Sequence, residues 1–179
     1  NVALPRRMSD AEAPGRQPSL CSIAFDPGRA ILACARGHAQ PKGAPGWVFV
    51  LPADDLQGAQ ARSYDCRFDP CWIELSPGSR RLAVAEHNGG VEVWRYDSQL
   101  RALADCVALP PLAVGGARLS CVRFLDERFL LASVGEVHSP GGILRWDLDD
   151  PAAQPVPALV ASEISRATRC LAVSPVEEL

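Results

Sequence analysis

The feature that most constrains the fold of this chain is a pattern that recurs about every fifty residues. Each copy opens with a short segment in which apolar residues alternate with other residues. Its anchor positions, which are 50, 49 and 49 residues apart, are Phe25, Leu75, Phe124 and Val173. A turn and a second apolar run follow each of the first three anchors. Such period-two alternation, bounded by Pro, Gly and Asn, predicts short strands joined by tight turns.

Each complete repeat predicts four short strands. In the second repeat they are residues 71–76, 81–86, 91–96 and 103–109. The first repeat predicts 20–26, 30–36, 47–51 and a faint strand within 61–68, the third predicts 120–125, 129–134, 143–148 and 157–161, and a further strand is predicted at 169–174. Prolines interrupt the few segments with helical spacing, so we expect an all-β fold. Repeats of this length with four strands are typical of β-propeller blades.

The repeats resemble those of the WD-repeat β-propeller family. The second repeat ends in Trp94, and the third carries the dipeptide Trp146-Asp147 after an alternating segment. The first repeat departs from the family pattern, because Val50 stands where the tryptophan is expected. The resemblance extends from about Leu20 onward and implies four-stranded antiparallel blades arranged radially. It also implies structural roles for Trp94, Trp146 and Asp147, with the two indole rings packed between adjacent blades.

We interpret the chain as one propeller domain that forms an incomplete ring. Its expected parts are the end of a preceding blade with a connecting loop (1–19), blade one (20–68), blade two (69–118), blade three (119–167) and the start of a further blade (168–179). The first part is assigned because residues 1–5 echo residues 106–110, the predicted outer strand of blade two. Because propellers usually close with about 4–8 blades, we expect a fragment of a longer propeller.

Charge and cysteine usage restrict the class of partner and the compartment. A net charge of −3 gives no electrostatic reason to bind nucleic acid. The longest uncharged apolar stretches are broken by proline and too short to cross a bilayer, so we expect no membrane insertion. The seven cysteines are odd in number and show no Cys-x-x-Cys spacing. We therefore expect buried free thiols and an intracellular protein, either cytoplasmic or nuclear.

The three histidines occupy the same place in successive repeats, in the loop predicted between the second and third strands. Such loops are expected on one rim of the propeller, where a rigid scaffold presents binding residues. The candidate partner-binding residues are Arg36, His38, Lys42, Glu86, His87, Asn88, Glu136 and His138. Ordinary turn chemistry is the alternative, with Asn88-Gly89 simply making a tight turn. We expect no metal site, because zinc ligands must converge to about 2.1 Å from one ion and these loops diverge.

No sequence motif indicates catalysis. The chain lacks a Gly-x-Ser-x-Gly elbow and a phosphate-binding Gly-x-x-x-x-Gly-Lys motif. The predicted inner strands carry few titratable residues, namely Asp26, Glu74 and Arg123. The resemblance implies a non-catalytic scaffold without cofactor or metal, whose rim loops bind other proteins or peptides in a multi-subunit complex. The alternatives are a propeller enzyme with an active site in its central channel and a nucleic-acid-associated scaffold subunit.

Overall fold

The computed structural model describes residues 19–26, 30–36, 46–52, 62–67, 69–86, 89–110, 119–135, 142–160 and 171–173. These residues form twelve strands and no helix, which confirms the predicted all-β fold. The strands are β1 (Ser19–Asp26), β2 (Ala30–Arg36), β3 (Trp47–Pro52), β4 (Arg62–Asp65), β5 (Pro70–Leu75), β6 (Arg81–Glu86), β7 (Val91–Asp97), β8 (Ala102–Ala108), β9 (Leu119–Phe124), β10 (Phe129–Val134), β11 (Gly142–Asp147) and β12 (Val156–Val160).

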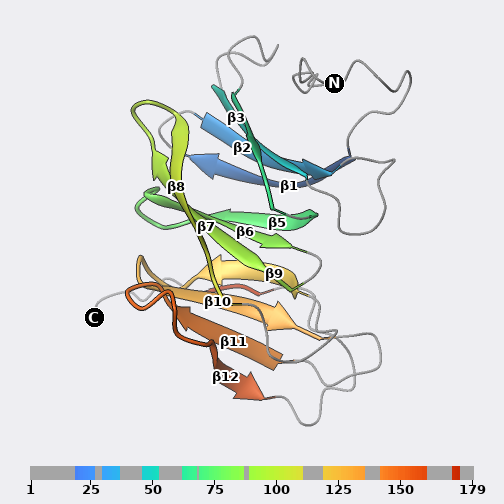
Figure 1. Cartoon of the computed structure of the whole chain (residues 1–179), viewed down its shortest axis with the longest axis vertical. Helices are drawn as coiled ribbons and strands as arrows, with labels where there is room; N and C mark the ends of the chain where they lie inside the picture. The colour runs from blue at the N-terminus through green and yellow to red at the C-terminus, as the bar shows by residue number, and fades with distance from the viewer. Residues whose placement is uncertain are drawn as a thin grey trace.

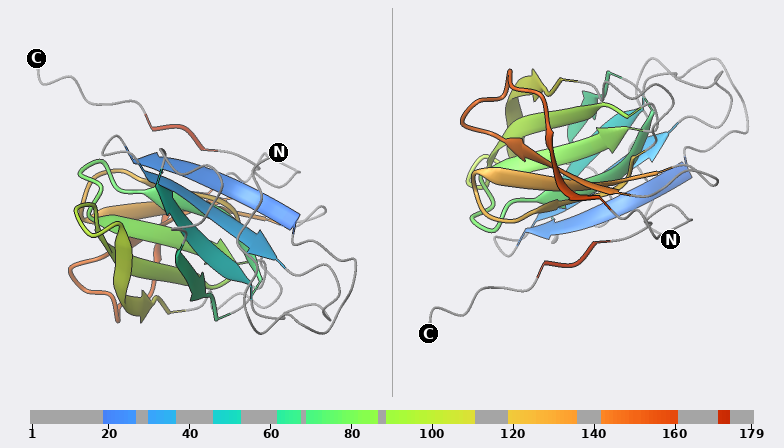
Figure 2. Two further views of the ribbon diagram at one scale, coloured as in Figure 1. Left: turned by 90° about the horizontal axis from the view of Figure 1, so that it is seen from above. Right: turned by 90° about the horizontal axis from the view of Figure 1, so that it is seen from below.

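The strands pair into three antiparallel sheets of four strands each. Their orders are β1-β2-β3-β4, β5-β6-β7-β8 and β9-β10-β11-β12, so each sheet is a meander of consecutive strands. We call these sheets blades one, two and three. They lie one over another in chain order (Figure 1), and views along the stack show the same arrangement (Figure 2). The first strand of each blade contacts the first strand of the next, β1 with β5 and β5 with β9, as in a propeller.

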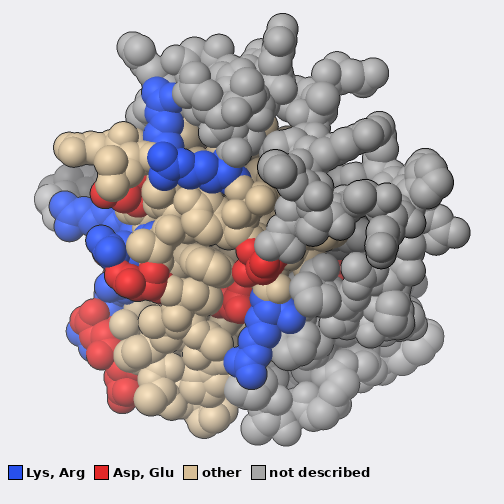
Figure 3. Space-filling model, turned by 45° about the horizontal axis from the view of Figure 1, so that its top comes forward, with Lys and Arg blue, Asp and Glu red and all other residues tan. Residues whose placement is uncertain are grey.

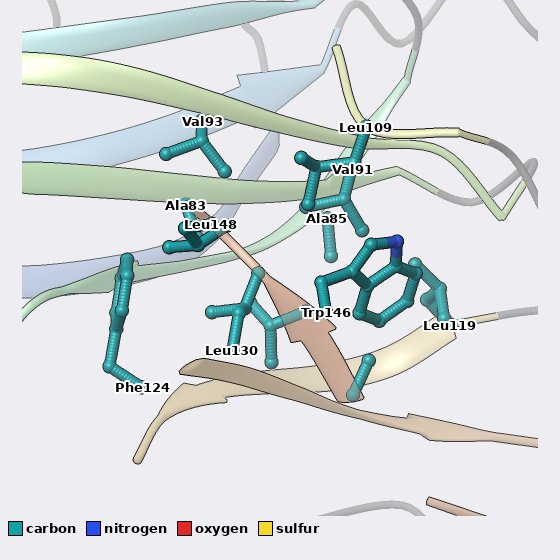
Figure 4. Packing of buried hydrophobic residues seen from close by; sticks show 12 residues of the cluster. Ala83, Ala85, Val91, Val93, Leu109, Leu119, Phe124, Leu130, Trp146 and Leu148 are labelled. Atoms are coloured by element: carbon teal, nitrogen blue, oxygen red, sulfur yellow. The ribbon is translucent and has the colours of Figure 1, made fainter. Parts of the chain in front are cut away.

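Two apolar clusters fill the spaces between the blades. One joins blades one and two, and it includes Leu32 of β2 and Leu82 of β6. The other joins blades two and three, and it includes Ala83 of β6, Leu130 of β10 and Trp146 of β11 (Figure 4). Neighbouring residues of β6 thus belong to different clusters, because successive side chains of a strand point to opposite faces of its sheet. Strand β6 of blade two is therefore buried on both faces.

Contacts between turns show that the equivalent ends of blades two and three lie together. The turn after β5 approaches the turn after β9, where the amide of Gly78 donates to Glu127 Oε1 at 2.5 Å. A Cβ atom at residue 78 would stand 2.8 Å from the same oxygen, so a larger residue there would displace the end of the Glu127 side chain. The guanidinium of Arg81 also donates to the backbone carbonyl of Glu127, at 2.9 Å. The two blades are thus joined by polar contacts at this end as well as by their apolar cluster.

The described part of the chain contains no helix with the length and hydropathy that a bilayer-spanning segment needs. Residues 1–18 of the segment expected to hold the end of a preceding blade and a connecting loop (1–19) lie outside the described residues, as does most of the segment expected to start a further blade (168–179).

Candidate partner-binding surfaces

The predicted rim residues fall mostly outside the described residues. Arg36 is the last residue of β2, where it pairs with Ser19 of β1. Six others lie outside the described part of the chain, namely His38, Lys42, His87, Asn88, Glu136 and His138. The recognition surface that they would form stays a prediction.

Glu86 is the one predicted rim residue whose side chain is described, and it is buried. It ends β6 with an exposed fraction of 1%. Its amide donates to the Gly90 carbonyl at 2.9 Å, and its carbonyl accepts from the Gly89 amide at 3.0 Å. The expectation that the Glu86 carboxylate faces a partner in solvent is therefore wrong. The physical reason is that β6 is a central strand covered on both faces, so its last side chain is enclosed by the neighbouring blades.

A second buried carboxylate, Glu92 of β7, lies where blade one meets blade two. Its exposed fraction is 5%, and its Oε1 accepts from the backbone amide of Arg67 at 3.2 Å. Its Oε2 is buried without a hydrogen-bond partner in the described part of the chain. Burial raises the pKa of Glu92, and the Arg67 amide offsets part of this rise. Burial also raises the pKa of the nearby Cys66 thiol, and the carboxylates of Glu92 and Glu86 raise it further.

Sequence reasoning did not identify Glu92 as a buried group. In a sheet with one solvent-exposed face, a glutamate between Val91 and Val93 would point into the solvent. In a blade packed on both faces, the same alternation places the carboxylate in the protein interior. The signal that could have identified it is the combination of blade architecture with a polar residue in a third strand.

The three titratable residues of the inner strands do not form one site. Arg123 of β9 makes an ion pair with Glu74 of β5, and its Nε donates to the Leu171 carbonyl at 3.1 Å. The guanidinium carbon of Arg123 lies 5.5 Å from the centroid of the Trp72 ring. Asp26 is engaged elsewhere, since it accepts from the Tyr96 hydroxyl at 3.0 Å. The contacts of Arg123 join blade three to Glu74 of blade two, and the contact of Asp26 joins blade one to Tyr96 of blade two.

No group of three or more potential metal ligands converges among the residues that the structure describes. Charged side chains of both signs lie side by side on the face shown in Figure 3, and neither sign forms a continuous field there. The described surface of that face therefore resembles a mixed polar surface more than the basic stripe of a nucleic-acid-binding protein.

The residues with expected structural roles lie at or beside the spaces between blades. Trp146 is fully buried in the cluster between blades two and three. Trp94 packs against the other cluster, with its ring edge-to-face to Tyr64 at 6.1 Å between centroids. Asp147 accepts from Arg128 Nε at 2.8 Å and from Nη2 at 2.6 Å. The hydrogen bonds and charge of Arg128 lower the pKa of Asp147 to about 2.

No protein-family model and no curated protein sequence matches the chain. Among solved structures, the chain is similar to Sqt1 of Saccharomyces cerevisiae, a WD40 propeller protein, with a TM-score of 0.51 and 11% sequence identity. The match covers 86% of this chain and 38% of Sqt1, so this chain spans about two fifths of the length of that neighbour. At this identity the likeness concerns the fold alone. Together with the three four-stranded antiparallel sheets, it shows blades of a β-propeller.

Proposed function

We propose that this chain is part of a non-catalytic scaffold that binds other proteins or peptides through the loops on one rim of its propeller. Strands β2, β6 and β10 are the second strands of equivalent blades, and they end at Arg36, Glu86 and Val134. Because the blades have the same strand order and stack in chain order, these three strands terminate at a common end of the stack. This common end is the observation that carries the proposal, since loops on a rigid scaffold are frequent binding sites.

The chemistry of the described inner strands supports a binding role over catalysis. Asp26, Glu74 and Arg123 are each engaged in a contact between blades. A general acid or base must reach the substrate with a suitably tuned pKa, and residues occupied in this way are poorly placed to do so. We further propose an intracellular location and membership of a larger assembly. The described cysteines, all free thiols, support a reducing compartment.

The proposal is tested by affinity capture with the full chain and a rim variant. The variant carries His38→Ala, His87→Ala and His138→Ala together, and Arg62→Ala in β4 of blade one is the control. We expect specific proteins to be retained by the wild-type chain and the control and lost from the triple variant, as judged by quantitative mass spectrometry. Equal retention by all three chains would overturn the rim-loop proposal. A turnover that disappears with Glu74→Gln would show an enzyme instead.

A further inference from the structure

A groove lies between blades two and three, and its lining runs along β7 and β8 from Arg80 and Arg81 to Leu109. It has a volume of about 390 Å³, which falls within the range of about 300–1,000 Å³ that is usual for ligand pockets. Its lining residues are Arg80, Arg81, Val93, Arg95, Asp105, Val107, Leu109, Leu148 and Pro151. Blade two supplies most of them, and the turn after β11 of blade three supplies Leu148 and Pro151. The groove therefore exists only because the two blades are packed together.

The floor of the groove is apolar. Val93, Leu109 and Leu148 belong to the cluster between blades two and three, as Figure 4 shows. Val107 of β8 extends this surface outward with an exposed fraction of 44%. An apolar side chain of a ligand that covered Val107 would remove this surface from water and extend a core that already exists.

The polar lining is dominated by arginine. Three arginines and one acidic residue line the groove, and this residue, Asp105, binds Arg95 at 2.7 Å. Arg81 donates to a neutral backbone carbonyl, so this contact leaves its charge uncompensated. The Arg80 side chain makes no hydrogen bond or ion pair with any part of the chain that the structure describes.

Acidic residues outside the lining are engaged in contacts of their own, and the carboxylate of Glu127, whose carbonyl binds Arg81, accepts from the Gly78 amide at 2.5 Å. Asp147 is the last residue of β11, and Asp149 follows it in the turn. Arg128 binds Asp147 at 2.6 Å and Asp149 at 3.3 Å. Arg80 and Arg81 thus remain two cationic groups beside an apolar floor. This combination complements carboxylates that flank an apolar side chain.

We propose that this groove binds an acidic peptide segment in an extended conformation, with one apolar side chain over Val107 and carboxylates against Arg80 and Arg81. A peptide fits the lining better than a nucleic acid does, because single-stranded nucleic acids are held by aromatic stacking and the lining contains no aromatic ring. The charged part of the site is remote from the rim loops of the proposed scaffold function, since Arg80 and Arg81 lie at the start of β6 and the rim loop follows its other end. Either surface can therefore fail its test without the other.

The test is a fluorescence anisotropy titration of the full chain against a fluorescein-labelled peptide, Asp-Glu-Phe-Asp-Leu-Glu-Asp. The informative variants are Arg80→Glu, which reverses a charge in the groove lining, and Val107→Glu, which places a charge on the apolar surface of the groove. Arg62→Glu is the matched control, because it makes the same change of charge at an exposed residue of blade one. All three sites are exposed, so we expect the variants to fold and to melt within a few degrees of the wild type.

We expect saturable binding by the wild-type chain, weakened about tenfold or more by Arg80→Glu and by Val107→Glu. Arg62→Glu should leave the dissociation constant unchanged within about twofold. A peptide with serine in place of phenylalanine and leucine should bind at least about tenfold more weakly. The proposal is overturned by any of three results: no saturable binding by the wild type, an equal loss with Arg62→Glu, or equal competition by a decamer of thymidine nucleotides.

Discussion

The hydroxyl of Tyr96 joins blades one and two through a single hydrogen bond. It donates from β7 to Asp26 Oδ2 at the end of β1, at 3.0 Å, and the Asp26 side chain is almost fully buried. Tyr96→Phe removes this donor and leaves part of a buried carboxylate unsatisfied, so the free energy of unfolding should fall by about 1–3 kcal/mol. Urea denaturation followed by tryptophan fluorescence measures this change. In an Asp26→Ala background the same substitution should cost clearly less, and an equal cost would mean that the bond contributes nothing.

Glu92 is a residue whose charge opposes folding. Because its pKa in the folded chain is raised above the ordinary value, the folded state favours the protonated side chain. Its contribution to stability is thus fully present below the unfolded pKa and is lost as the pH rises through the folded pKa. Glu92→Gln keeps an oxygen acceptor for the Arg67 amide and removes the charge. At pH 7.5 we expect this variant to melt about 2–4 °C above the wild type, the shift that about 1 kcal/mol makes in a chain of this size.

The pH dependence distinguishes this explanation for Glu92→Gln from a simple improvement in packing. Thermal melts of both chains are followed by circular dichroism at a series of pH values. The difference in melting temperature between them should shrink as the pH falls toward the ordinary pKa of glutamate. A difference that stays constant over this series would exclude the charge of Glu92 as its cause.

At the scale of strands and turns, an ion pair holds the β10–β11 hairpin together. It joins Arg128, which precedes β10, to Asp147, the last residue of β11. Asp147 binds the Arg128 guanidinium through both oxygens, and its Oδ1 also accepts from the Asp149 amide at 3.1 Å. Because Arg128 lowers the pKa of Asp147 to about 2, the stabilisation is present above the unfolded pKa and lost as the pH falls toward 2. Asp147→Asn should therefore lower the melting temperature at pH 7, and the gap to the wild type should close in acid. Melting curves at pH 7, 4 and 2.5 check this, and a gap that widens in acid would contradict it.

Strands were predictable where local sequence carries both the turn and the burial pattern. Pro77-Gly78 marks the turn between β5 and β6, and the apolar run that follows becomes the buried strand β6. The strand β4 is faint in the sequence because its side chains are largely exposed, which leaves no apolar alternation to detect. The burial of Glu86 could not be predicted in this way, because it depends on neighbouring blades far away in the sequence. The groove between blades two and three could not be predicted either, because its lining residues come from two repeats.

At the scale of the whole molecule, equivalent positions in the repeats have very different environments. Phe25 and Phe124 are anchor residues of blades one and three, and their exposed fractions are 67% and 5%. Ile23 and Val122, two residues earlier, show the same contrast. The face of blade three that carries Phe124 packs on blade two, whereas the equivalent face of β1 meets no other blade among the described residues. We expect that this face of β1 packs against another blade, and the prediction that residues 1–19 hold the end of a preceding blade and a connecting loop stays untested.

This difference predicts opposite outcomes for one substitution at two equivalent places. Phe124→Ser should lower the free energy of unfolding by about 3–5 kcal/mol, because it removes a buried ring from the cluster between blades two and three. Phe25→Ser should change it by no more than about 0.5 kcal/mol, because its ring is already in water. Phe25→Ser should also reduce self-association of the chain, since an exposed apolar face favours contact between molecules. Urea denaturation measures the first pair of effects, and sedimentation velocity at several concentrations measures the last. If Phe25→Ser destabilised the chain as much as Phe124→Ser does, the outer face of β1 would be covered in solution, and the stack would not end there.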